Sequence, residues 1–337
     1  MVDLLNALLE ESAISKDLKN LFADTLVKLC RHSCRFPACL ILNDITVDAD
    51  NQVVTGGYSQ VSRGQIQGQP IAMKQVTLYM SRMEVMMKAC AREAIIWSRL
   101  SHPNLLPFYG IFYLANDRSR ISLVSPWIEH GHIGQYLERF PQTDREPLAM
   151  DIAQGIEYLH TCLPTIVHGD LKPVRYHIQS CMRVITANIV VQFNIFVTPS
   201  GTACLADFGL AYAKDPQRRT ATSTQGPAHG GTYPYEAPEL LLNEEPVSFA
   251  GDVYAFACVL YEMYSGMQPF HLQTVARVIL ALTAGERPAR CAEVNDAMWG
   301  LIERCWHQDP AQRPSASDVV RYLGSFAAVD EQRRQHQ

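Results

Sequence analysis

Residues 166–173 read IVHGDLKP and residues 203–209 read ACLADFG, and these two stretches decide the fold. Each begins with apolar residues, which predicts a short buried strand, and each continues into an aspartate. Asp170 in HGD therefore stands at a turn, where its carboxylate can accept a proton. Asp207 in DFG stands at a strand end beside a flexible glycine, where it can bind a divalent cation. Either tripeptide alone also arises by chance.

Further charged residues stand in a fixed order around these two aspartates. Lys74 in IAMK falls on a predicted strand, and Glu93 in REAIIW falls on a predicted helix, residues 83–99, from which it can hold the lysine. Downstream, residues 237–239 read APE, and Arg313 in DPAQRPS offers Glu239 an ion-pair partner. The order and spacing turn weak single signals into a strong joint one.

On these motifs, residues 46–328 resemble a eukaryotic protein kinase domain, and most of all the tyrosine-kinase-like branch. The resemblance implies an α+β fold of two lobes. A small β-rich lobe with one main helix would span about 46–125, and a larger, mostly helical lobe about 131–328, with a hinge near Ser125 to Gly131. Short β-rich runs before 125 and helical periodicity after 130 agree with this. Residues 1–45 would form a helical extension and residues 329–337 a polar tail.

The resemblance also implies ATP and Mg²⁺ as cofactors and a role for each site residue. Asp170 would orient the attacking hydroxyl and Lys172 would steady the transferred phosphate. Asn194 and Asp207 would hold the metal. The expected nucleotide-binding residues are Gly56, Ser59, Val61, Ala72, Lys74, Glu93, Ser125 and Trp127, with Ser125 behind the adenine and Trp127 in the hinge.

Specificity is expected for Ser and Thr rather than Tyr hydroxyls. The pair Lys172 and Pro173 is similar to the serine/threonine kinase pattern. So is the stretch GGTYPYEAPE, in which Thr232 would face the catalytic aspartate. A protein substrate is therefore the expected partner.

Two regions depart from the family pattern, one in a way that bears on nucleotide binding and the other in a way that bears on regulation. Val54, Gly56 and Ser59 stand at the three positions of the glycine-rich loop, which predicts weakened nucleotide affinity because side chains hold the backbone away from phosphates. Gly169 stands where many kinases have an arginine, so a phosphate on loop residues 220–224 would lack that partner.

The catalytic loop is interrupted between Asp170 and its expected metal ligand. The family places an asparagine at the position that Arg175 occupies here, whereas the tail NIFV starts at Asn194. Removing residues 174–192, VRYHIQSCMRVITANIVVQ, gives HGDLKPFNIFV and restores the spacing. Two explanations stay open: an intron read through in frame, since valine codons begin GT and glutamine can be CAG, or a true loop insertion.

Two functions follow from these observations. One is an active ATP- and Mg²⁺-dependent Ser/Thr kinase. The other is a pseudokinase scaffold that binds nucleotide without turnover, which the thinned glycine loop and the interrupted catalytic loop favour. In the second case the N-terminal helices would dock a partner protein.

The N-terminal region predicts two amphipathic helices, because apolar residues recur at helical spacing through residues 2–32. Such helices pack on their own domain or form a docking surface for another protein. Cys30, His32, Cys34 and Cys39 lack paired metal-ligand spacing, so buried thiols are expected there rather than zinc.

The composition excludes several classes of function. The 337 residues carry 29 basic and 34 acidic side chains, a net charge of -5, and no basic stripe, so nucleic acid is not expected as a partner. No apolar stretch approaches the roughly 18 residues that span a bilayer. Scattered cysteines and the absence of a secretory pattern indicate a soluble protein of the reducing cytoplasm.

Overall fold

The computed structural model describes residues 1–11, 13–47, 54–55, 59–77, 83–114, 117, 120–163, 165–172, 194–208, 212–213, 233–242 and 246–335. Several residues singled out from the sequence lie outside these ranges, namely Gly56, Thr232, the segment 174–192 and loop residues 220–224. The side chains of Val54 and Ser59 are also outside the description.

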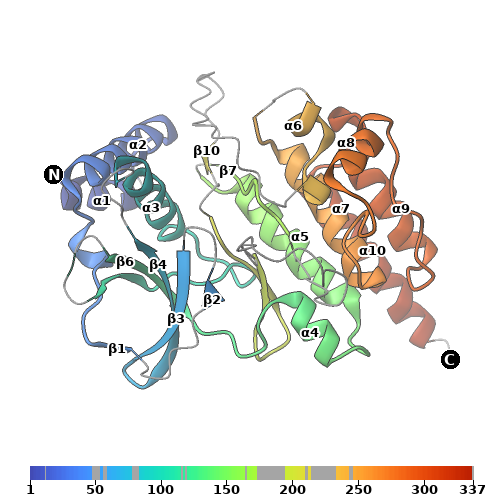
Figure 1. The fold of residues 1–337 in the computed structure, drawn as a ribbon, viewed down its shortest axis with the longest axis horizontal. Helices are drawn as coiled ribbons and strands as arrows, with labels where there is room; N and C mark the ends of the chain where they lie inside the picture. Colours follow the sequence, from blue (N-terminus) through green and yellow to red (C-terminus); the bar gives the residue numbers. More distant parts are fainter. Residues whose placement is uncertain are drawn as a thin grey trace.

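An antiparallel sheet forms the first half of the kinase-like region (Figure 1). Its strand order is β1-β3-β4-β6-β5, and β2 pairs with β3. The strands are β1 (Ile45–Val47), β2 (Val54–Thr55), β3 (Ser59–Ile66), β4 (Gln69–Thr77), β5 (Gly110–Tyr113) and β6 (Arg120–Pro126). Alternation along β4 buries Ile71 and Met73 with Val124 in one small cluster. Ala72 and Lys74 consequently face the opposite side.

Three helices lie on one side of this sheet (Figure 1): α1 (Val2–Glu10), α2 (Lys16–Ser33) and α3 (Met83–Trp97). Helix α2 contacts both α1 and α3. Leu26 and Cys30 on α2 are fully buried, so the N-terminal helices pack on their own chain, which was one of the two alternatives from the sequence. Leu4, Leu18 and Leu21 remain about half exposed, and a docking role for that outer face stays a prediction.

The N-terminal cysteines form no disulfide bonds with other described residues. Cys30, Cys34 and Cys39 are free, and burial raises the pKa of Cys30 to about 12. No group of three or more His, Cys, Asp or Glu side chains within the described ranges could hold a metal ion.

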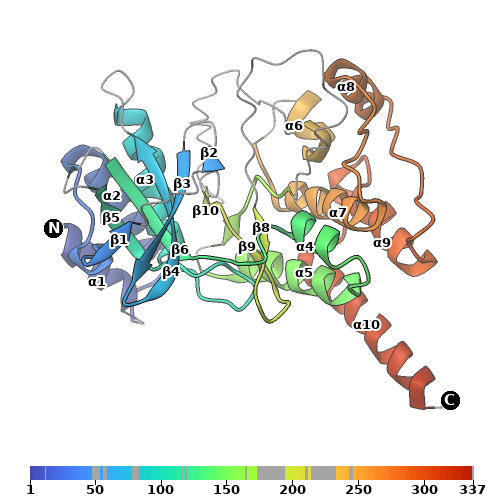
Figure 2. The ribbon, with the colours of Figure 1, turned by 60° about the horizontal axis from the view of Figure 1, so that its bottom comes forward.

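The second half is mostly helical. Its helices are α4 (Ile133–Arg139), α5 (Arg145–Thr161), α6 (Pro238–Leu242), α7 (Phe249–Ser265), α8 (Val275–Thr283), α9 (Asp296–Cys305) and α10 (Ala316–Gln335), with short 3₁₀ turns at Ala38–Leu40, Tyr233–Tyr235 and Pro310–Gln312. Figure 2 shows α10 running out to the C-terminus, so the expected polar tail begins inside this helix.

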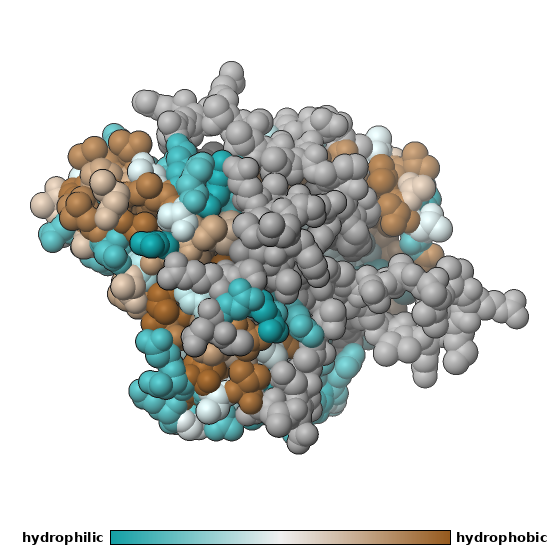
Figure 3. All heavy atoms as spheres, turned by 60° about the vertical axis from the view of Figure 1, so that its left-hand side comes forward, coloured by the Kyte–Doolittle hydropathy of each residue, from teal (hydrophilic) through white to brown (hydrophobic). Residues whose placement is uncertain are grey.

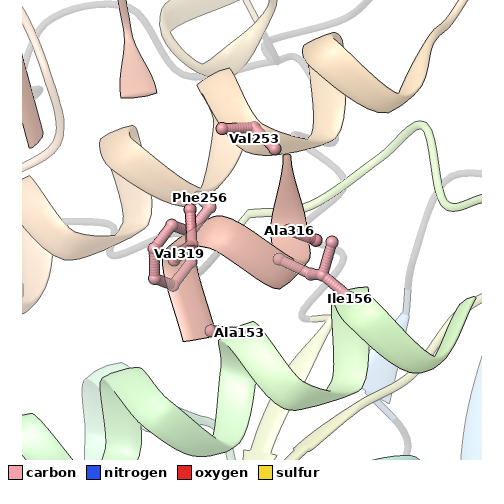
Figure 4. A pocket seen from close by; sticks show the side chains of 6 residues that line it. All are labelled: Ala153, Ile156, Val253, Phe256, Ala316 and Val319. Carbon is pink, nitrogen blue, oxygen red and sulfur yellow. The ribbon is translucent and has the colours of Figure 1, made fainter. Parts of the chain in front are cut away.

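Helix α7 is the centre of the helical half. The Ser248 side chain accepts the Gly251 N–H at its start, and Gly266 ends it in a left-handed conformation at φ 72°. Apolar residues surround almost its whole circumference, which is the pattern of a helix buried on all sides. Figure 4 shows a small apolar cavity beside it, a packing gap between α5, α7 and α10. The cavity is lined by Ala153, Ile156, Val253, Phe256, Ala316 and Val319.

Four short strands lie between the two halves: β7 (Ile166–Val167), β8 (Ile195–Val197), β9 (Ala203–Leu205) and β10 (Tyr212–Ala213). β7 pairs with β10 and β8 pairs with β9, all antiparallel. The chain thus has the α+β, two-lobed arrangement expected from its sequence, with these strands at the junction. None of the helices described here is both long and apolar enough to traverse a bilayer.

Candidate active site

Lys74 joins the two lobes through ion pairs with two carboxylates. Its Nζ lies 2.7 Å from Glu93 Oε1 on α3 and 2.7 Å from Asp207 Oδ1 after β9. Burial alone would lower the pKa of Lys74, but the charges of Asp207 and Glu93 outweigh it and raise that pKa above its ordinary value. The lysine is therefore a fixed cation between the sheet and the catalytic segment.

The two carboxylates respond differently to this lysine. Burial raises the pKa of Glu93, and Lys74 only partly opposes the shift. For Asp207 burial acts in the same direction, yet Lys74 reverses it and lowers the pKa below the ordinary value. Asp207 is thus the carboxylate held in its charged form, as a metal ligand must be.

Asp170 and Lys172 form a second ion pair on the loop after β7. Lys172 Nζ lies 2.9 Å from Asp170 Oδ1, and both side chains are largely buried. Burial raises the pKa of Asp170, while the charge of Lys172 opposes that shift. A carboxylate whose proton affinity is raised in this way is suited to accept a proton from a bound hydroxyl.

Asn194 closes the loop that begins at Asp170. Its Nδ2 donates to the backbone carbonyl of Asp170 and, at 3.1 Å, to Asp170 Oδ2. Because both partners are acceptors, the amide nitrogen must face them and the oxygen must face away. Asn194 Oδ1 is buried and has no hydrogen-bond partner among the described residues. A buried carbonyl oxygen without a donor suits a hard cation such as Mg²⁺.

The DFG segment is anchored by ring packing and an unusual backbone. Asp207 has a left-handed φ of 64°. Phe208 is fully buried, with ring centroids 5.8 Å from Trp97 on α3 and 5.5 Å from His168. His168 Nε2 also lies 3.1 Å from the Ala206 carbonyl. These contacts fix the segment carrying Asp207 to the segment carrying Asp170.

Asp252, at the start of α7, holds the loop that carries Asp170, although no sequence motif pointed to it. Its carboxylate accepts the backbone N–H groups of His168 and Gly169 at 2.9 and 2.8 Å, and His160 Nε2 lies 2.9 Å from it. An aspartate in the first turn of an otherwise apolar, buried helix was the available signal, since a buried charge needs partners.

The expected adenine wall lies where β3, β4 and β6 pair. Val61 stands opposite Lys74, and Ala72 stands opposite Ser125, so these side chains share one face of the sheet. Ser125 is buried. Trp127 was expected among the nucleotide-binding residues of the hinge. Its backbone N–H donates to the Pro70 carbonyl at 3.2 Å, which connects the hinge to β4.

Glu239 of the APE sequence binds Arg313 in a two-pronged pair, as its sequence suggested. Arg313 Nη1 and Nη2 lie 2.7 and 2.8 Å from the two carboxylate oxygens. The arginine side chain is fully buried and also donates to the carbonyls of Ala250 and His307. This pair connects α6 with the segment before α10.

Comparisons with known proteins point in one direction. A family model described as protein tyrosine and serine/threonine kinase matches residues 47–323. The probable serine/threonine-protein kinase drkC of Dictyostelium discoideum is 28% identical over 81% of this chain and 34% of its own length. From Arabidopsis thaliana, the serine/threonine/tyrosine-protein kinase HT1 is 28% identical over 82% of this chain and 65% of its own length.

A third relative matches a similar share of this chain. The serine/threonine-protein kinase CTR1 of Arabidopsis thaliana is 27% identical over 81% of this chain and 30% of its own length. The chain therefore spans less than two thirds of each of these three relatives.

Proposed function

Because the chain belongs to the protein tyrosine and serine/threonine kinase family, we propose that it transfers the γ-phosphate of ATP to hydroxyl groups of a protein substrate. One observation carries the proposal. Lys74 contacts Asp207, Lys172 and Asn194 both contact Asp170, and the Ala206 N–H donates to the Asn194 carbonyl at 2.8 Å, so four separate segments of the chain carry these groups into one region.

The proposed chemistry assigns each group one task. Asp170 holds the attacking hydroxyl and accepts its proton as the new O–P bond forms and the bond to the leaving ADP oxygen breaks. Lys172, 2.9 Å from Asp170, places a positive charge beside the transferred phosphoryl group. Lys74 holds the other phosphates, and Glu93 keeps Lys74 in place.

The residues present fit a magnesium ion. The unpaired Oδ1 of Asn194 and the charged carboxylate of Asp207 are hard oxygen ligands, and substrate phosphates would complete the coordination. When bound, Mg²⁺ neutralises phosphate charge during transfer. Two protein ligands are the usual number for Mg²⁺ at a nucleotide site.

Serine and threonine hydroxyls are the proposed acceptors. The Lys172 contact with Asp170 supports this choice, and the relatives drkC and CTR1 are both named as serine/threonine-protein kinases. HT1 is named as a serine/threonine/tyrosine kinase, so tyrosine peptides belong in the same assay.

The decisive test replaces Asp170 with asparagine, which keeps the shape and removes the proton acceptor. We expect phosphate transfer from ATP to a generic protein substrate to fall by about 10²-fold or more. Thermal stabilisation by ATP with Mg²⁺ should persist in Asp170→Asn. Asp296→Asn, at an aspartate with a 93% exposed side chain, is the matched control and should transfer normally. Equal rates in wild type and Asp170→Asn would refute the proposal.

A pseudokinase is the second candidate, because residues 173–193 separate Lys172 from Asn194 along the chain. A scaffold of this kind would be stabilised by ATP and would show no transfer, whether or not residues 174–192 are present. Its docking surface would be the outer face of α1 and α2 that carries Leu4, Leu18 and Leu21.

A further inference from the structure

More of the surface of helix α3 is buried than its packing against the sheet alone accounts for. Seven of the residues 87–97 are buried, and the others, Lys88, Ala89, Arg92 and Ile96, lie along one side of the helix. A helix lying on a sheet normally buries a single stripe and leaves the opposite face polar. Helix α3 has two sets of partners instead: the sheet with Lys74 on one side, and helix α2 on another.

Helix α3, which contacts α2, carries a row of fully buried and mostly small side chains. Met87, Cys90, Ala91 and Ala94 recur at helical spacing on α3, and each has at most 1% exposure. Leu26 and Cys30, one turn apart on α2, are completely buried in the same core. Small residues let two helices approach closely, so the fit depends on the side chains of α2.

This contact lies beside the catalytic ion pair. Cys90 is one helical turn before Glu93, and burial together with nearby Glu93 raises the pKa of its thiol, with smaller influences from Lys74 and Cys30. A change in packing at Cys90 therefore displaces Glu93. Burial raises the pKa of Glu93, so the charged pair with Lys74 needs support from its surroundings.

The end of α3 is held by α1 as well. Arg99 Nη2 donates to Asn6 Oδ1 at 3.0 Å, and Arg99 Nη1 lies 3.5 Å from Glu10 Oε1. Asp3 Oδ1 in turn accepts the N–H of Ala38 at 2.6 Å, which ties α1 to the segment after α2. Helix α2 thus packs against α3, and α1 contacts the residue Arg99 just after its end (Figure 1).

We propose that α2, through Leu26 and Cys30, holds α3 where Glu93 reaches Lys74, so that the N-terminal helices are a positioning element of the phosphoryl-transfer site. The inference rests on the proposed function and concerns its regulation. Helices α1 and α2 lie outside residues 47–323, which match the family model, so this contact is an addition to the family domain. Gly169 stands where many kinases have an arginine that pairs with a phosphate on the loop. The contact between α2 and α3 would order α3 without such a phosphate.

The test compares two identical changes on one helix. Leu26→Ala shortens a side chain that is fully buried in the core shared with α3, whereas Leu21→Ala alters a side chain that is 50% exposed. The first readout is maleimide labelling of Cys90, followed by mass spectrometry. Cys291, a partly buried thiol of the helical half, serves as internal reference. We expect Leu26→Ala to speed labelling of Cys90 relative to Cys291 at least tenfold, and Leu21→Ala to leave the ratio unchanged.

The second readout is phosphate transfer. Leu26→Ala should lower kcat at least fivefold while KM for ATP changes less, because Glu93 acts on the position of Lys74 during transfer. Leu26→Met, which conserves volume, should restore most of kcat. In a Glu93→Gln background, Leu26→Ala should add little, since both changes remove the same contact. If Leu26→Ala does not fold, Cys30→Ala, which removes a single sulfur atom, replaces it.

The outcomes separate the two proposals. Equal Cys90 labelling in Leu26→Ala and Leu21→Ala overturns the inference, whether or not the wild-type chain transfers phosphate. Faster labelling with unchanged kcat also overturns it. If the wild-type chain transfers no phosphate, the proposed function fails by itself, and Cys90 labelling still decides whether α2 holds α3.

Discussion

The carboxylate of Asp252 accepts the backbone N–H of Gly169, with 2.8 Å between Oδ1 and nitrogen. The same carboxylate accepts the N–H of His168 and contacts His160 Nε2. Asp170 follows directly in the chain. Asp252, on the central helix α7, therefore fixes the position of the proposed proton acceptor. Asp252 is a positioning residue in this arrangement.

Replacing Asp252 with asparagine should weaken both the fold and the activity. One of the acceptor oxygens becomes an amide donor, so a buried N–H loses its partner at a cost of about 1–3 kcal/mol. A displacement of Asp170 by about 1 Å lowers transfer on the order of 10²-fold. Urea unfolding and kcat measure the two effects. Asp296→Asn serves as control, and wild-type kcat in Asp252→Asn would contradict the positioning role.

Gly169 has a left-handed backbone conformation and little space for a side chain beside Val247. Its φ is 76°, and an added Cβ would lie 3.3 Å from Val247 Cγ2. Gly68 has nearly the same φ, 78°, with nothing within 4 Å of an added Cβ. Both Gly→Ala changes carry a left-handed strain of about 1–2 kcal/mol. We expect Gly169→Ala to cost more than Gly68→Ala in denaturant unfolding, and an equal loss would show that Val247 yields freely.

The buried pair of Glu239 and Arg313 should be sensitive to loss of one partner. Glu239→Gln leaves a fully buried guanidinium without a full counter-charge, at a cost of about 3–5 kcal/mol. Glu286→Gln removes the same charge from a pair with Arg277 whose side chains are about half exposed, and should cost under about 1 kcal/mol. Comparable losses in the two variants, measured by urea unfolding, would contradict this account.

Deleting residues 174–192 should raise phosphate transfer. Lys172 and Asn194 both contact Asp170, and the deletion leaves only Pro173 and Phe193 between them along the chain. Along the chain, the 19 residues separate the proposed proton acceptor from a proposed metal ligand, and a shift of about 1 Å at the reacting groups costs on the order of 10²-fold. We expect at least a tenfold increase in kcat, absent when Asp170→Asn is combined with the deletion. Sequencing the mature transcript separately decides between intron and insertion.

The outer surface of the N-terminal helices is the remaining prediction from the sequence. Figure 3, which turns this side of the molecule forward, shows apolar side chains gathered on it, and Leu4, Leu18 and Leu21 are among the exposed ones. Leu26 and Cys30, which are buried on another face of α2, leave these leucines available to a partner protein.

Much of this protein could be predicted from local sequence. The short strand before Asp170, the strand before Asp207 and the helix carrying Glu93 each have a pattern that depends on neighbouring residues alone, and the structure has all three. Order and spacing of the motifs then indicated the kinase family, which the family model over residues 47–323 confirms.

Only the tertiary structure decided how distant segments support the site. Asp252 lies far along the chain from Gly169, and Leu26 lies far from Cys90, so no periodicity links either pair. Side-chain patterns report which residues are buried, whereas the identity of their partners depends on how whole elements pack. The sequence therefore determined which groups could carry the chemistry, and the packing of α7 and α2 against those groups determined where they are held.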